Sequence, residues 1–496
     1  MDNRGDLGLR GRLAALEPYT TKSFSLDVPL EHGGREVLNC RELLRCLPGK
    51  RLACVAEWRG ETVFAKLFLD VQRARAHWQR EEAGIRILGS RGILTPTLIH
   101  SGSVGDGVYL ILYRYIPEGV TAATTWESSS DAERLGLIRR LAVLLAGHHG
   151  AGIVQRDLHL GNFLLADGLL YTLDGDGISA AAGPLGRRAA LGNLALLLAQ
   201  LPPCFDKYLD DILEQYIAAG SGVVTGTDSG VLRRLVGTKR ERRKRNFLEK
   251  TMRECTAFVC WKAWGEVTVY DRTYDTEAMR RLLADPDAHV AVGEPLKKGN
   301  TCTVTRVEVG GRSLVVKRYN IKSRFHTLNR AFRPSRAAVS WRNAHRLLFY
   351  GIATPKPVAL VEKRWGPLRQ RAYFITEFVP GVDCLAYMLD GTVAPKRKSI
   401  VAEAIAEMLK NLHSLKISHG DLKGTNIRIC DHRVMLIDLD SMRQHSHGAG
   451  FARAWRRDMR RFFKNWAHVK PVGALFEKLL VGFATASDKL DPPCSS

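Results

Sequence analysis

Two short stretches of this chain repeat one pattern of polar side chains at the same intervals. Each contains an Asp, an Asn five residues later, a second Asp twelve residues after the Asn, and a third Asp two residues beyond. These residues are Asp157, Asn162, Asp174 and Asp176 in the first stretch, and Asp421, Asn426, Asp438 and Asp440 in the second. One such spacing arises easily by chance, but two copies, each with a His eight residues before the first Asp, indicate a duplicated catalytic loop.

The residue types suit phosphoryl transfer, in which a protein orients a hydroxyl nucleophile and neutralises the phosphates of a nucleotide. We expect Asp421 to act as the base that accepts or orients the proton of the acceptor hydroxyl. Asn426 and Asp438 offer ligands to Mg²⁺, a hard cation that prefers oxygen, and Asp440 is an auxiliary acid. The first stretch assigns the same roles to its own residues, with Asp157 as the base and Asn162, Asp174 and Asp176 at the metal.

A Lys that holds the phosphates is expected on a strand upstream of each loop. Lys66 lies near the end of the run TVFAKLF, and Lys317 ends an alternating run in the second half. Glu81 and Glu82 are the candidates for the acid that positions Lys66. The corresponding stretch of the second half, SWRNAHRLLFYG, contains no Glu, so Asn343 or a more distant acid would have to orient Lys317.

The segments around these residues predict an α+β fold in two tandem domains. Residues 1–70 alternate or run apolar between Gly and Pro, which is typical of a β-rich lobe. The run VYLILYRYIPEG, residues 108–119, predicts a further strand and a hinge against which an adenine could bind. Residues 130–150 have helical apolar spacing and lead into the first loop. We place the domains at residues 1–269 and 270–496.

Two further positions are expected to support each loop. His419 stands two residues before Asp421, whereas the first copy has Gln155, which can donate a hydrogen bond but cannot carry a proton. Asp458, in the helix after the second loop, could hold the loop backbone, and Asn193 would do so less strongly in the first copy. These differences could weaken the first unit.

The motif HGDLKGTN followed by IDLD resembles the atypical kinases that phosphorylate sugars, and among them the lipopolysaccharide core kinases of the Kdo and heptose kinase family. The runs VVKRYN, SWRNAHRLLFYGIATPKPVAL and YFITEFVPG support the same family more narrowly. The resemblance covers nearly all of the second half and, more loosely, most of the first. It implies two bilobal protein-kinase-like domains, ATP and Mg²⁺ as cofactors, and a heptose or Kdo hydroxyl of the lipopolysaccharide inner core as acceptor.

Composition limits the partners and the location. The net charge is +23, which favours an acidic substrate, a nucleic acid or an anionic membrane face. Basic residues concentrate in residues 233–250, which read either as a solvated helix face or as a site for lipid phosphates, and in residues 321–346. No signal peptide and no spanning segment is predicted, so we expect a cytoplasmic protein, with peripheral contact to the anionic inner-membrane surface.

Other functions fit part of the pattern. Phosphorylation of a protein or of a small cationic drug uses a similar loop, but a cationic substrate needs an acidic surface, which this chain lacks. A pseudokinase that binds nucleotide or glycolipid and serves as a scaffold in envelope assembly fits Gln155 and the missing Glu near Lys317. Basic and aromatic residues mixed in 321–346 also suit RNA, yet the linked catalytic loop favours an anionic glycolipid, so nucleic acid is not expected.

Overall fold

The computed structural model describes residues 8–16, 23–30, 32–47, 49–220, 222–299, 301–320, 334–366, 368–431 and 433–483. They form two compact units, the first ending at residue 241 and the second beginning at residue 242, with residues 202–204 also assigned to the second. The expected boundary at 269/270 is therefore placed too late. Strand β12 (Phe258–Ala263) lies before it and β13 (Glu266–Asp271) spans it, yet both pair into the sheet of the second unit.

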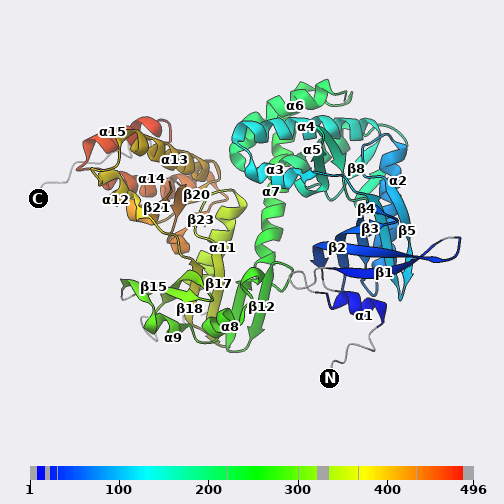
Figure 1. Ribbon diagram of the computed structural model, residues 1–496. Helices are drawn as coiled ribbons and strands as arrows, with labels where there is room; N and C mark the ends of the chain where they lie inside the picture. Colours follow the sequence, from blue (N-terminus) through cyan, green and yellow to red (C-terminus); the bar gives the residue numbers. More distant parts are fainter. Residues whose placement is uncertain are drawn as a thin grey trace, which may run out of the picture. The chain divides into compact units, whose positions relative to one another are not determined.

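The first unit contains a six-stranded antiparallel sheet of order β1-β2-β3-β4-β6-β5 (Figure 1). Along β4 the side chains alternate between the two faces, so Val63 and Ala65 are fully buried on one face and Lys66 lies on the other. Helix α2 packs on the face of Lys66, and α1 packs on the opposite face. The bounds are α1 (Leu9–Ala14), β1 (Phe24–Pro29), β2 (Arg35–Leu47), β3 (Arg51–Trp58), β4 (Glu61–Phe68), α2 (Ala74–Ser90), β5 (Leu98–Gly105) and β6 (Val108–Arg114).

Helices and short strands complete the first unit. Helix α4 begins at a capping box in which Ser130 and Glu133 bond to each other's backbone N–H groups, and it ends directly before the first predicted loop. A hairpin of β9 and β10 and the pair β8–β11 flank that loop. The bounds are β7 (Val120–Thr121), α3 (Ala122–Ser128), α4 (Asp131–Gly150), β8 (Ile153–Gln155), β9 (Phe163–Ala166), β10 (Leu169–Thr172), β11 (Ile178–Ala180), α5 (Arg187–Leu198) and α6 (Leu209–Ala218). Helix α7 (Ser229–Lys250) begins in the first unit and ends in the second.

The second unit contains a seven-stranded antiparallel sheet of order β12-β13-β17-β18-β16-β15-β14. Helix α11 packs on one face with the large helical core, and α8 packs on the other through Met279, Leu282 and Leu283. The remaining bounds are α8 (Glu277–Ala284), α9 (Pro286–Val292), β14 (Glu294–Lys298), β15 (Cys302–Val309), β16 (Arg312–Tyr319), α11 (Arg336–Phe349), β17 (Pro357–Trp365) and β18 (Leu368–Glu377).

The helical part of the second unit follows its sheet in the chain. Helix α13 leads into the second predicted loop, and the hairpin β21–β22 and the pair β20–β23 flank it. The bounds are β19 (Val382–Asp383), α12 (Cys384–Leu389), α13 (Pro395–Ser414), β20 (Ile417–Ser418), β21 (Ile427–Cys430), β22 (Arg433–Leu436), β23 (Arg443–Gln444), α14 (Gly448–Lys464) and α15 (Lys470–Leu479).

The two units repeat one local topology around the loops. The neighbours β3-β4-β6-β5 of the first sheet correspond in order to β15-β16-β18-β17 of the second. The hairpins have the same register, because Phe163 pairs with Thr172 in the first unit, and Ile427 pairs with Leu436 in the second, 264 positions later. Helices α4 and α13 end 264 positions apart as well. The mixed helix and strand content confirms the α+β prediction.

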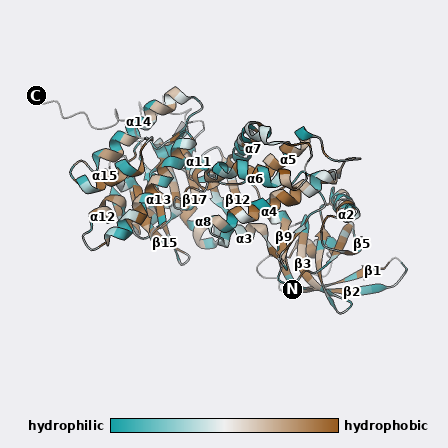
Figure 2. Ribbon diagram, turned by 90° about the horizontal axis from the view of Figure 1, so that it is seen from above, coloured by the Kyte–Doolittle hydropathy of each residue, from teal (hydrophilic) through white to brown (hydrophobic). Residues whose placement is uncertain are grey.

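Hydrophobic residues concentrate in the sheets and in buried helices of each unit, such as β17 and α5 (Figure 2). Within the described ranges, no helix combines the length and the apolar character that crossing a membrane requires. The basic run 233–250 forms most of α7 and is not a uniformly solvated face. Arg240 is buried and donates two hydrogen bonds to Asp206, of 2.6 and 2.7 Å, and Lys244 is buried and donates to Gln444.

Candidate active site

The two loops predicted to be catalytic are built the same way. In each, the Asn side chain turns back and donates through Nδ2 to the backbone carbonyl of the Asp five residues earlier, at 2.8 Å for Asn162 to Asp157 and 2.8 Å for Asn426 to Asp421. The bond orients each amide and leaves its Oδ1 atom without a donor among the described residues. Both Asn residues are buried, whereas Asp157 and Asp421 reach solvent.

The strand-borne acids share an uncommon backbone conformation. Asp174 and Asp438 both have left-handed backbone angles, with φ of 66° and 62°. A residue other than Gly in this region costs free energy, and such residues cluster at functional sites. The conformation occurs at equivalent positions directly after the two hairpins, so the turn that presents each acid is part of the repeated design.

In the first unit Lys66 is held by the acids that the sequence proposed. Its ammonium group contacts Glu81 Oε1 and lies 3.5 Å from Asp174 Oδ1. Glu81 is fully buried on α2, and its carboxylate also accepts hydrogen bonds from the Tyr113 hydroxyl at 2.9 Å and from the N–H groups of Gly175 and Asp176 at 3.0 and 3.1 Å. One side chain thus joins the sheet, the helix and the loop that carries Asp174.

Glu82, the other candidate, points elsewhere. Its carboxylate accepts from Arg86 at 2.8 Å and from the Ser101 hydroxyl at 2.9 Å, and it has no contact with Lys66. Consecutive residues of a helix face directions about 100° apart, so Glu81 reaches Lys66 on β4 while Glu82 reaches Ser101 on β5. Of the two candidates, Glu81 and not Glu82 contacts Lys66 in the structure.

Helix α2 and the loop after Asp174 touch through their backbones. Gly84 and Gly175 approach so closely that a Cβ atom on either residue would overlap backbone atoms of the opposite segment. The absence of side chains at both positions allows Glu81 to reach the N–H groups of the loop. The contact fixes the helix and the loop in one arrangement.

Asp176 is surrounded by basic side chains. It accepts from His77 at 2.7 Å and from Arg80 at 2.5 Å, and Arg51 lies 3.6 Å away. Burial alone would raise the pKa of Asp176, but the hydrogen bonds from Arg80 and His77 hold it below its usual value. The described conformation therefore commits Asp176 to ion pairs and leaves it no free oxygen for a metal.

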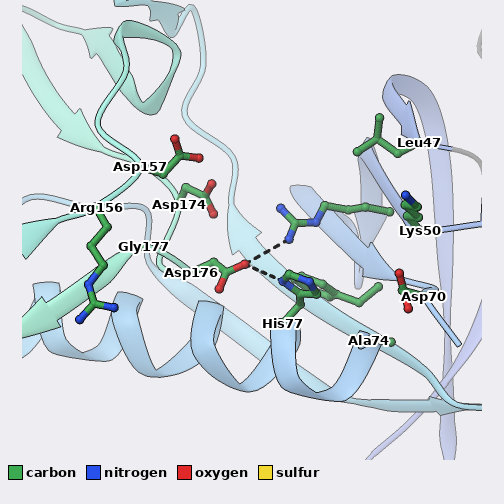
Figure 3. A pocket seen from close by; sticks show the side chains of 12 residues that line it. Leu47, Lys50, Asp70, Ala74, His77, Arg156, Asp157, Asp174, Asp176 and Gly177 are labelled. Carbon is green, nitrogen blue, oxygen red and sulfur yellow. Dashed lines mark hydrogen bonds and ion pairs between the residues drawn. The ribbon is translucent and has the colours of Figure 1, made fainter. Parts of the chain in front are cut away.

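A cavity of about 550 Å³ opens in front of these acids (Figure 3). Asp157, Asp174 and Asp176 lie on one wall, and Lys50 and Asp70 lie across from them. The sequence reasoning missed Lys50, Arg51, His77 and Arg156 as lining residues. Lys50 lies in the turn before β3 and Arg51 begins β3, so both become part of the site only when β3 and β4 pair.

In the second unit Lys317 contacts Asp438 and Asp440 directly. Its Nζ atom lies 2.5 Å from Asp438 Oδ1 and 3.3 Å from Asp440 Oδ2. Arg336 reaches the same oxygen of Asp440 at 2.8 Å. Burial would raise the pKa of Asp438, but the charge of Lys317 holds it below its usual value, so the carboxylate stays ionised at neutral pH.

Asn343, proposed as a partner of Lys317, has another role. Its side chain donates to the carbonyl oxygens of Leu439 and Met442, both at 2.9 Å, and does not contact Lys317. Asn343 on α11 thus ties its helix to the acid-bearing loop through two carbonyls, as Glu81 on α2 does through two N–H groups. The helix and the loop are therefore joined in both units, but Glu81 accepts its two hydrogen bonds from the loop, whereas Asn343 donates its two to the loop.

The supporting residues occupy their predicted places. Asp458 is buried and accepts from the N–H groups of His419 at 2.7 Å and Gly420 at 3.0 Å, which holds the second loop. The imidazole of His419 is 3.0 Å from the carbonyl of Ile437. In the first unit Gln155 donates to the equivalent carbonyl of Leu173 at 3.4 Å, and Asn193 donates to the carbonyl of Gln155 at 2.8 Å. Gln155 therefore replaces the hydrogen bond of His419.

The donor set fits a hard divalent cation in each unit. Asp174 Oδ1 is buried and accepts no hydrogen bond from the described residues, and Lys66 Nζ lies 3.5 Å from it. Asn162 donates through Nδ2, which leaves its Oδ1 without a donor in the same part of the chain. Burial would raise the pKa of Asp174, but the positive charges of Lys66 and Arg51 hold it well below its usual range. Among the described residues, no group of three or more His, Cys, Asp and Glu side chains is placed to hold a metal by itself. Mg²⁺ typically uses one or two carboxylates together with phosphate oxygens and water, so this sparse set suits it.

Comparison with known proteins shows a family to which the second unit is similar. Residues 287–479 match the model of the lipopolysaccharide kinase (Kdo/WaaP) family. The chain is also similar to the lipopolysaccharide core heptose(I) kinase WaaP of Escherichia coli (strain K12), at 28% identity over 157 residues. That similarity spans 29% of this chain and 59% of the relative. The second unit is therefore similar to kinases of the lipopolysaccharide kinase family.

Proposed function

We propose that the protein is an ATP-dependent kinase that phosphorylates a heptose or Kdo hydroxyl of the lipopolysaccharide inner core. We also propose that it consists of two tandem protein-kinase-like units with the residue roles assigned above. The best support comes from the unit that matches the family model. There Lys317 contacts Asp438, whose backbone is left-handed, and Asn426 is hydrogen-bonded to Asp421, whose side chain reaches solvent.

The side chains suggest how the acceptor hydroxyl is handled in the second unit. Asp421 Oδ2 lies 2.9 Å from Lys423 Nζ and 3.2 Å from Asn426 Nδ2, which leaves Oδ1 to accept the hydrogen of the hydroxyl. Both neighbours also fix the carboxylate in one orientation, which supports positioning of the nucleophile. In the first unit Asp157 would have the same task.

The nucleotide is proposed to lie between the strand Lys and the left-handed Asp. Lys317 and Lys66 would release their present carboxylate contacts in part and bind the α- and β-phosphates. Asn426 and Asp438, and in the first unit Asn162 and Asp174, would hold Mg²⁺, which when bound neutralises charge on the phosphates. Asp440 and Asp176 are engaged by basic side chains and are assigned auxiliary roles.

Charge supports an anionic acceptor at a membrane. With 74 Lys and Arg residues against 51 Asp and Glu residues, the protein is attracted to phosphorylated glycolipids and to the cytoplasmic face of the inner membrane. The expected acceptor is therefore the core of lipopolysaccharide during envelope biosynthesis. The expected location is the cytoplasm with peripheral membrane contact.

The test is transfer of the γ-phosphate of labelled ATP to lipopolysaccharide that lacks core phosphate. Asp421→Asn and Asp157→Asn should each lower turnover by their own unit by about 10²-fold or more, because each change removes the base and keeps the shape. Asp431→Asn, in the exposed turn of the β21–β22 hairpin, is the matched control and should leave transfer unchanged. If the wild type binds ATP but labels no acceptor, the scaffold function is favoured instead.

A further inference from the structure

The second unit contains a larger cavity next to its catalytic loop. The cavity has a volume of about 1230 Å³ and is lined by α11, by β23 and the loop before it, and by α14. Gly420 and Asp440, from the two loops of the active site, form part of its wall. Sites for small ligands typically occupy about 300–1,000 Å³, so this cavity is large enough for a charged sugar and not only for a single ion.

The lining is strongly basic. Eight Lys and Arg side chains line the cavity against four Asp and Glu side chains. Three of the four acids are already engaged: Asp440 by Lys317 and Arg336, Glu362 by Arg364, and Asp458 by two backbone N–H groups. The cavity therefore carries a positive charge that its own acids do not neutralise.

Two of the arginines are available to a ligand. Arg342 on α11 and Arg443 on β23 are exposed, and neither side chain makes a hydrogen bond or ion pair within the parts of the chain that the structure describes. Guanidinium groups bind carboxylates and phosphates in a bidentate manner, with short charge-assisted hydrogen bonds. Guanidinium groups that have no acidic partner repel one another, and a bound anion would remove this repulsion.

Arg336 connects the cavity to the active site. Its guanidinium lies over the ring of Tyr319, 5.1 Å from the centroid, and donates to the Asp440 oxygen that Lys317 also approaches. An anion that enters the cavity competes with Asp440 for Arg336. Release of Asp440 would in turn weaken its hold on Lys317, the Lys that is proposed to bind the nucleotide phosphates.

We propose that this cavity binds an anionic group, a phosphate or a carboxylate, of the glycolipid acceptor and so positions the acceptor at Asp421. The inference rests on the proposed function and adds the surface that recognises the substrate. The shared chemistry also fits free phosphate, so the test must separate the two sources.

The experiment measures binding rather than turnover. The double variant Arg342→Gln/Arg443→Gln is compared with Arg453→Gln/Arg456→Gln, which removes the same charge from exposed positions of α14 that do not line the cavity. The probes are lipopolysaccharide without core phosphate, the same glycolipid after chemical removal of its remaining phosphates, and inorganic pyrophosphate, each titrated at fixed ionic strength. ATP affinity of each protein is measured as the check on folding.

We expect the cavity variant to bind the glycolipid at least tenfold more weakly, while the control variant changes less than about threefold and ATP affinity stays the same in both. Equal binding by both variants and the wild type would overturn the inference and leave the proposed function standing. Wild type that binds ATP but no glycolipid would overturn the proposed function. Pyrophosphate that displaces the glycolipid at micromolar concentration, and binds as tightly alone, would assign the cavity to free phosphate instead.

Discussion

The buried carboxylate of Glu81 offers the sharpest test of how the first unit is held together. Glu81→Ala leaves Lys66 without its nearest acid and leaves the N–H groups of Gly175 and Asp176 without an acceptor. Removing one partner of a buried ion pair costs about 3–5 kcal/mol. Asp174 stays 3.5 Å from Lys66 and compensates in part, so we expect about 3 kcal/mol for the first unit.

The assay is hydrogen exchange of peptides from α2, β4 and the loop after Asp174, with peptides of the second unit as an internal reference. A loss of about 3 kcal/mol corresponds to about 100-fold faster exchange in the first unit, since 1.4 kcal/mol is a factor of ten. The matched control is Glu82→Ala, which loses an i,i+4 pair with Arg86 worth about 0.3–0.5 kcal/mol and a bond from Ser101. If the two variants exchange equally fast, the role given to Glu81 is refuted.

Three further outcomes are expected. Asn343→Ala should speed exchange of residues 438–444 by about tenfold or more, because two buried carbonyls lose their donor, whereas Asn411→Ala on α13, whose side chain has no such bond, should not. Burial lowers the pKa of His345 to about 3, so between about pH 6.5 and pH 3 the unfolded chain binds a proton that the folded second unit does not. As the pH falls through that window, the free energy of unfolding of the second unit should decrease by up to about 1.4 kcal/mol per pH unit. In His345→Phe, the free energy of unfolding measured with urea should depend less on pH. Association with anionic vesicles should weaken between low and physiological salt as the screening length shortens, and binding that ignores salt would contradict the electrostatic account.

The parts of the site that the sequence could predict are those encoded locally. Asp157 with Asn162, and Asp421 with Asn426, are five residues apart, and the hydrogen bond between each pair needs only the turn between them. The acids after the hairpins follow from the same short segments. Repetition of these segments in one chain made the prediction much stronger than either copy alone.

The parts that could not be predicted depend on contacts between distant segments. Lys317 meets Asp438 and Asp440 across more than a hundred residues, and nothing in the stretch SWRNAHRLLFYG points to them. The choice between Glu81 and Glu82 depends on the rotation of α2 about its axis, which the sheet fixes. The unit boundary was missed because β12 and β13 show their membership only through pairing with β17.

The bare backbone contact between Gly84 and Gly175 gives a way to separate the two halves genetically. Ala at position 84 would favour the helix itself, yet its methyl group would push α2 off the loop and draw Glu81 away from Lys66, while every polar side chain of the site remains present. A strain carrying this allele would retain an untouched second unit. Paired with Asp421→Asn in a sister strain, it would show which effects of the protein depend on each unit.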